Sequence, residues 1–65
     1  MNLREQLKSW MEQRRTVSVY VIGESEGYIL GRITRLEDDF VEIQMREGMK
    51  IVPLDKIGYI TLKQD

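Results

Sequence analysis

The stretch GYILGRITRLEDDFVEIQ, residues 27–44, determines the fold that this sequence predicts. Branched and aromatic side chains dominate the runs 28–36 and 40–45, as is typical of β-strands. The acids Glu37, Asp38 and Asp39 separate the runs and indicate a turn, in which we expect Asp38 to accept backbone N–H bonds. Gly31 interrupts the first run, where a glycine is expected to mark a bend. Whether the acids also mark a binding site stays open at this point.

Three further runs on either side of this stretch have the composition of short strands. A loop with glycine at both ends, residues 23–27, follows the first of them. REG is expected to form a later tight turn, and PLDK a short 3₁₀ connection. These expected strands cover residues 16–22, 49–52 and 57–62. With the two strands above, they predict a mainly β fold: a strongly bent, antiparallel, five-stranded SH3-like barrel over residues 16–63.

The N-terminal segment has the spacing of an amphipathic helix. Its apolar residues recur at the helical spacing of i, i+4, i+7 and i+8 and are Leu3, Leu7, Trp10 and Met11. Asn2 is a good N-cap, and Glu5 stands at the third helical position of a capping box. We therefore predict a helix over residues 1–15 that covers one open end of the barrel. The whole chain, residues 1–65, is expected to be a single domain.

The size of the chain favours self-association. A domain of 65 residues buries only about 60% of the surface that its unfolded chain exposes. With no Cys and no His in the sequence, disulfides and the usual metal sites cannot add stability. The last two expected strands are short, apolar and lightly charged, which is unusual for sheet edges that face water. We therefore expect these two edges to pair with another copy of the chain.

Composition excludes several classes of function. Ten basic and eleven acidic residues give a net charge of −1, so any nucleic-acid site has to be a local patch. The N-terminus is too polar for a signal peptide or a membrane span, which favours a cytoplasmic protein without a membrane partner. Without His or Cys no catalytic constellation assembles, so we expect no enzyme, no catalytic residue and no cofactor. The three acids lack EF-hand spacing, and no metal site is predicted.

Several stretches resemble the Sm-like family, most closely its bacterial Hfq branch. RRTVSVYVIG resembles the end of the Hfq helix with the first strand, GYILGRI resembles the segment around the strand-two glycine, and DDFVEI resembles the core of the first Sm motif. PLDKI has the short length of the family's last connection. The resemblance implies a ring of six or seven copies, joined through strands four and five. It also implies binding of single-stranded RNA, often uridine-rich or adenosine-rich, by an RNA chaperone or riboregulatory scaffold.

The resemblance also suggests which residues contact RNA. Arg14 and Arg15 match a basic rim at the end of the helix, and Tyr20 matches an aromatic residue that stacks on bases. Lys56, like Lys50, lies near the proposed seam between copies. Each has an alternative structural role: the helix dipole favours cations at its C-terminus, tyrosine is common in strands, and surface lysines maintain solubility. A second hypothesis is therefore an SH3-like module that binds proteins and not RNA.

The chain departs from the family pattern at the acidic loop. Glu37 replaces the family's stacking residue, Asp39 replaces the next polar position, and Glu42 replaces the Sm asparagine. PLDKI contains neither the Lys-His pair of Hfq nor the Arg-Gly pair of the Sm proteins. In a ring, every copy would bring these acids toward the axis and repel a polyanion within a Debye length of about 8–10 Å. RNA is therefore expected to avoid the loop and to use Arg14, Arg15 and Tyr20.

Overall fold

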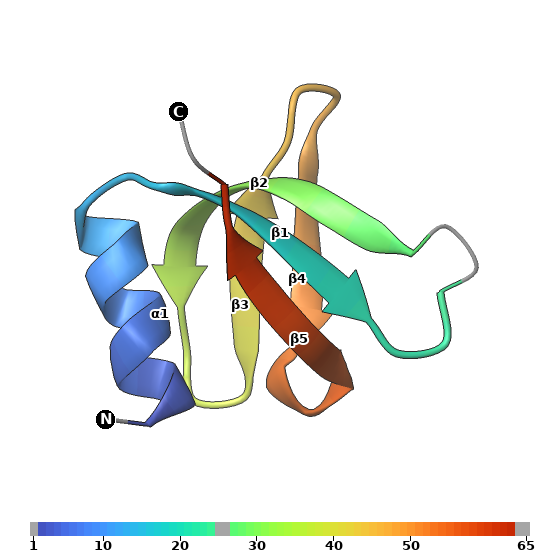
Figure 1. Ribbon diagram of the computed structural model, residues 1–65, viewed down its shortest axis with the longest axis horizontal. Helices are drawn as coiled ribbons and strands as arrows, with labels where there is room; N and C mark the ends of the chain where they lie inside the picture. Colours follow the sequence, from blue (N-terminus) through green and yellow to red (C-terminus); the bar gives the residue numbers. More distant parts are fainter. Residues whose placement is uncertain (1, 25–26, 64–65) are drawn as a thin grey trace.

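A computed structural model describes residues 2–24 and 27–63 (Figure 1). The elements, in chain order, are α1 (Leu3–Glu12), β1 (Thr16–Val21), β2 (Tyr28–Leu36), β3 (Phe40–Gln44), β4 (Met49–Pro53), the 3₁₀ helix η1 (Leu54–Lys56) and β5 (Ile57–Leu62). The five predicted strands are confirmed, with bounds that differ by at most one residue. The tip of the predicted loop at 23–27, residues 25–26, lies outside the described residues. No helix in the described part of the chain is long and apolar enough to cross a membrane.

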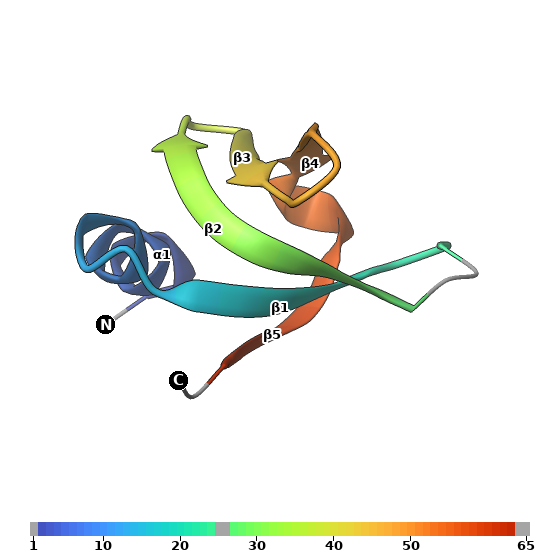
Figure 2. The same ribbon diagram turned by 90° about the horizontal axis from the view of Figure 1, so that it is seen from above.

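The strands form one antiparallel sheet in the order β4-β3-β2-β1-β5. β2 is the long central strand and curves strongly, so that one half pairs with β1 and the other half with β3 (Figure 2). A register shift between Ile33 and Arg35 places a bulge in β2, and a bulge increases local twist. β4 and β5 lie at the two ends of the sheet, which confirms the predicted edges.

Gly31 lies where the backbone of β2 is close to β3. A Cβ atom built on Gly31 would lie 2.8 Å from Ile43 Cγ2, and it would also overlap the carbonyl oxygen of Gln44. Any side chain at this position would push β3 away from β2. The predicted bend therefore has a specific reason: only glycine lets the two backbones meet inside the curve.

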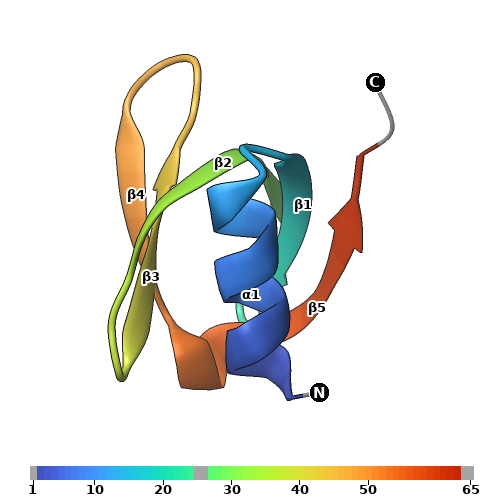
Figure 3. The ribbon, with the colours of Figure 1, turned by 90° about the vertical axis from the view of Figure 1, so that its left-hand side faces the viewer.

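The inner face of the curved sheet and one helical residue form the core. Its buried residues are Leu7, Val17, Val19, Val21, Ile29, Ile33, Val41, Ile43 and Val52. Trp10 and Met11 pack against this core as predicted, and α1 lies across the open side of the sheet (Figure 3). Leu3 remains 48% exposed, so the predicted apolar stripe enters the core only from its second member onward.

The helix is shorter than predicted because the chain turns at Arg14. α1 ends at Glu12, and Arg14 has a φ of 57°, in the left-handed region that favours glycine. The Arg14 N–H donates to the carbonyl of Met11 (3.1 Å), and the Arg15 N–H donates to the carbonyl of Trp10 (3.0 Å). These two bonds form a Schellman motif. The prediction of helix for residues 13–15 is therefore wrong. Residues 13–15 form the turn instead, and β1 begins directly after it at Thr16.

Candidate functional site

Three tyrosines form one row across the outer face of the sheet. The strand register places Tyr20 of β1 opposite Tyr28 of β2 on one side and opposite Tyr59 of β5 on the other. The rings of Tyr20 and Tyr59 are stacked, with centroids 5.1 Å apart and planes 9° apart. We call these residues the tyrosine row. All of the tyrosines in the chain belong to it.

The sequence suggested Tyr20 as the stacking residue, but the exposed rings of the row are those of Tyr28 and Tyr59. Tyr20 is half-buried, and its ring also packs over Gly58, where an added Cβ would lie 3.1 Å from Tyr20 Cε2. Tyr28 and Tyr59 are 64% and 62% exposed. Tyr20 therefore supports Tyr59, while Tyr28 and Tyr59 present free ring surface. The sequence alone marks neither ring, because their position beside Tyr20 depends on strand pairing.

The tyrosine row has the chemistry of a stacking platform. Leu30 and Ile22 are also exposed beside it, so this face of the sheet carries an unusual amount of apolar surface. Aromatic rings fixed on strands lose little conformational freedom when a flat ligand stacks on them, and a stacked nucleobase contributes about 1–3 kcal/mol. The surface therefore suits planar, aromatic ligands.

Arg14 meets a second arginine at the end of α1. The side chains of Arg14 and Arg32 line one hollow of about 330 Å³, whose floor includes Met11 and Ile33. In the described part of the chain neither guanidinium forms an ion pair. Arg15, predicted beside Arg14, is half-buried and does not line this hollow. Sequence reasoning missed Arg32 because the pairing of β1 with β2, which places Arg32 opposite Thr16 and so beside the helix end, is not visible in the sequence.

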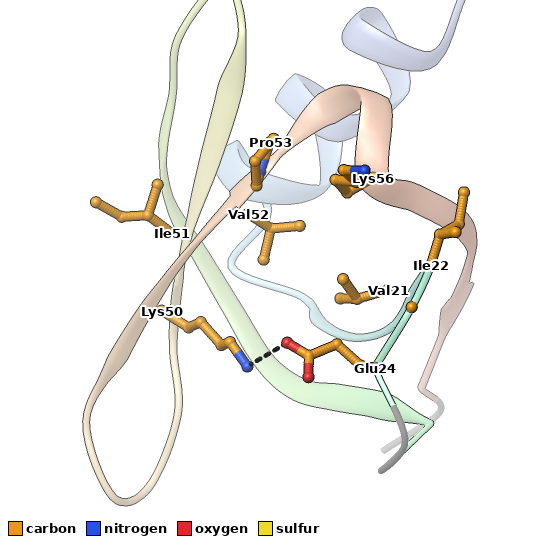
Figure 4. A pocket seen from close by; sticks show the side chains of 9 residues that line it. Val21, Ile22, Glu24, Lys50, Ile51, Val52, Pro53 and Lys56 are labelled. Atoms are coloured by element: carbon orange, nitrogen blue, oxygen red, sulfur yellow. Dashed lines mark hydrogen bonds and ion pairs between the residues drawn. The ribbon is translucent and has the colours of Figure 1, made fainter.

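Lys56 lies in a different place from the arginines. It lines a hollow of about 400 Å³ between the end of β1 and β4, together with Lys50 and Glu24 (Figure 4). The Lys50 ammonium donates to Glu24 Oε1 at 3.1 Å across this hollow. The predicted site residues Arg14, Tyr20 and Lys56 therefore belong to three separate surfaces.

Hydrogen bonds and ion pairs within the protein hold the acidic loop. The Glu37 N–H donates to the Phe40 carbonyl (2.9 Å), and Arg4 of α1 donates to the Glu37 carbonyl (2.6 Å). The carboxylate of Asp38 lies 3.7 Å from Arg4, and no backbone N–H of the described residues donates to it. The Asp38 side chain is therefore fully exposed, with Arg4 at the limit of an ion-pair distance, and it does not close its own turn in the predicted way.

Arginine partners reduce the charge that the loop presents. Arg35 Nε donates to Glu37 Oε2 at 2.7 Å, and this hydrogen bond and charge raise the pKa of Arg35. Asp38, Asp39 and Asp55 line a hollow of about 390 Å³ beside η1. The acids of the described residues form no group that could hold a metal ion. The unneutralised acidic surface is thus centred on Asp39 and Asp55, and it excludes Glu37.

The fold is similar to those of two solved Hfq proteins. One crystal structure, of the pleiotropic translational regulator Hfq, has a TM-score of 0.80 and 14% sequence identity, over 94% of this chain and 89% of that chain. Another, of an Hfq protein from Anabaena sp., has a TM-score of 0.77 and 22% identity, over 91% of this chain and 92% of that chain. No protein-family model and no curated protein matches the sequence. The chain therefore has the Sm-like, Hfq-type fold that its sequence stretches suggested.

Proposed function

We propose that this chain binds single-stranded RNA on the tyrosine row and acts, without catalysing a reaction, as an RNA chaperone or riboregulatory scaffold. The observation that carries the proposal is the pair of exposed rings, Tyr28 and Tyr59, held on either side of Tyr20. One of the solved structures with this fold is described as a translational regulator, which agrees with an RNA ligand.

The tyrosine row is better explained by a ligand than by packing. A tyrosine that only fills the core would be buried, yet two rings of the row are more than half exposed. Every nucleobase has a flat apolar face, so such rings bind single strands with little preference for sequence. With a net charge of −1 the whole molecule gives no long-range attraction for RNA. Stacking on the tyrosine row therefore supplies most of the affinity, and cations on neighbouring surfaces, such as Arg14, add to it.

We also propose that copies of the chain associate through the edges of the sheet, as a ring of six or seven. β4 and β5 are the two end strands, and each leaves one side of its backbone unpaired within the chain. On β4 the side chains of Met49 and Ile51 are 51% and 52% exposed. Exposed apolar edges of this kind favour pairing with a further strand. A closed ring would cover every such edge.

Fluorescence anisotropy with labelled adenosine-rich, uridine-rich and mixed single-stranded RNAs tests the proposed function. We expect binding that weakens in the double variant Tyr28→Ala, Tyr59→Ala by at least about tenfold, since each ring contributes about 1–3 kcal/mol. The matched control is Tyr28→Phe, Tyr59→Phe, which keeps both rings and should keep the affinity. Absence of binding by the unmodified protein at low salt would reject an RNA ligand and favour the protein-binding module.

A further inference from the structure

We infer that Arg32 and Arg46 form a backbone-binding site for the same strand of RNA, at the bend of β2, beyond the tyrosine row. The inference rests on the proposed function and adds the path of the RNA along the protein. The bases stack on the tyrosines, and the neighbouring phosphates contact the arginines. Arg32 and Arg46 line one hollow of about 280 Å³. Neither residue is part of the tyrosine row.

β2 runs from the tyrosine row to the hollow of Arg32 and Arg46 along one face of the sheet. Tyr28, Leu30 and Arg32 alternate on the outer face of β2, and all three are exposed. Four residues of strand span about 13 Å, and the curvature of β2 shortens this path. At a rise of about 3.4 Å per nucleotide, a segment of about four stacked nucleotides covers the distance. A single short RNA can therefore contact both places on one copy of the chain.

The hollow combines an apolar floor with two free guanidinium groups. Leu30 and Met45 contribute apolar surface, and Arg32 and Arg46 contribute the charges. Neither arginine forms an ion pair with any side chain in the described residues, although Glu47 follows Arg46 in the turn. A guanidinium group matches the geometry of a phosphate oxygen pair, which makes arginine well suited to this contact.

The turn that carries Arg46 is fixed before any ligand arrives. The Met45 N–H donates to the Gly48 carbonyl at 2.7 Å. The side-chain amide of Gln44 donates to the carbonyls of Met45 and Gly48, both at 3.2 Å. Gln44 is also the register partner of Arg32, so one residue connects the positions of both arginines. A site held in place in this way loses less entropy when it binds.

The test compares two RNAs of different length across a series of salt concentrations. For an RNA of about six nucleotides, we expect Arg32→Gln, Arg46→Gln to lower the affinity and to reduce the salt slope by about 0.7 for each lost phosphate contact. For a dinucleotide, which covers only the tyrosine row, the same variant should bind like the unmodified protein. The matched control is Arg35→Gln, which removes the same charge from the same strand but from an arginine already engaged by Glu37.

The outcomes separate the inference from the proposed function. Suppose that the unmodified protein binds RNA and that the double tyrosine variant has a lower affinity. If Arg32→Gln, Arg46→Gln then behaves like Arg35→Gln, the inference is wrong and the proposed function stands. An equal loss for both RNA lengths would also overturn it, because the arginines would then act at the tyrosine row. If the double variant does not fold, Arg46→Gln alone, on an exposed turn, should still reduce the slope for the longer RNA. No RNA binding at all would reject the proposed function itself.

Discussion

The two ends of α1 both lie among charged side chains, but the charges are used differently. At its start, Arg4 contacts the loop that contains Glu37 and Asp38, and Arg35 pairs with Glu37. At its end, Arg14 lies beside Arg32 with no acidic partner in the described residues. Charges that pair with each other stabilise a loop and attract few ions, whereas unpaired charges remain available to a ligand. The comparison indicates that availability, more than the number of charges, identifies a binding surface.

The largest expected effect is on the helix that joins these two regions. Leu7 is fully buried, so Leu7→Ala should lower the free energy of unfolding by about 2–5 kcal/mol, through lost burial and the cavity that remains. The same change at the half-exposed Leu3 is the control and should cost much less. Thermal and urea denaturation measure both. Equal losses would mean that α1 is not anchored by Leu7, and the two ends would then not be held in their relative positions.

Tyr20→Ala tests the contribution of the supporting ring. Removal of the ring under Tyr59 should weaken RNA binding by about 1–3 kcal/mol, although Tyr20 itself offers less free surface than its neighbours. Tyr20→Phe keeps the stack and should bind normally. Anisotropy titrations give the affinities, and circular dichroism checks the fold. Normal binding by Tyr20→Ala would show that Tyr59 does not depend on this support.

Arg14→Gly should change stability and binding in opposite directions. Relief of a left-handed backbone, about 1–2 kcal/mol, exceeds the entropy that glycine adds to the unfolded chain, about 0.4–1 kcal/mol. We therefore expect a rise of about 0.5–1 kcal/mol in the free energy of unfolding, together with weaker RNA binding. Arg14→Asn, which tolerates the left-handed region and is uncharged, separates loss of charge from added flexibility. Loss of stability in Arg14→Gly would contradict the assigned role of this turn.

The smallest effects are expected at the acidic loop. Asp39→Asn removes a carboxylate that has no ion pair among the described residues, and it should leave RNA binding unchanged or slightly stronger. Glu37→Gln removes the partner of Arg35, an exposed pair for which about 0–1 kcal/mol of stability is typical. Both variants are measured by anisotropy and thermal denaturation. Loss of RNA binding in Asp39→Asn, with the oligomer intact by light scattering, would make this loop a ligand site.

The sequence predicted the strands well because their signals are local. Alternation and glycine positions depend on near neighbours, so residues 28–36 and 57–62 were assigned with the bounds that the structure has. The predicted end of the helix was wrong because nothing in the local sequence indicates that Arg14 adopts a left-handed backbone.

The candidate site was only partly predictable from the sequence. Tyr20 was identified, but its exposed partners Tyr28 and Tyr59 depend on strand pairing. The pairing of Arg4 with a loop more than thirty residues away depends on the path of the whole chain. Contacts of this kind leave no periodic pattern in a single sequence. The roles assigned to Arg14, Arg15, Tyr20 and Lys56 stay predictions.

The position of β4 and β5 at opposite ends of one sheet has a consequence for mixtures of intact and damaged copies. Contact between two different edges joins unlike surfaces, so each copy supplies one edge and receives the other. A copy whose β5 edge is blocked can still pair its own β4 edge with the β5 edge of a neighbour, and it then ends the chain of contacts. In the proposed ring, a minority of such copies would keep a majority of assemblies from closing. A defect in one gene copy would therefore act dominantly, and its potency in subunit mixing would grow with the number of members in the ring.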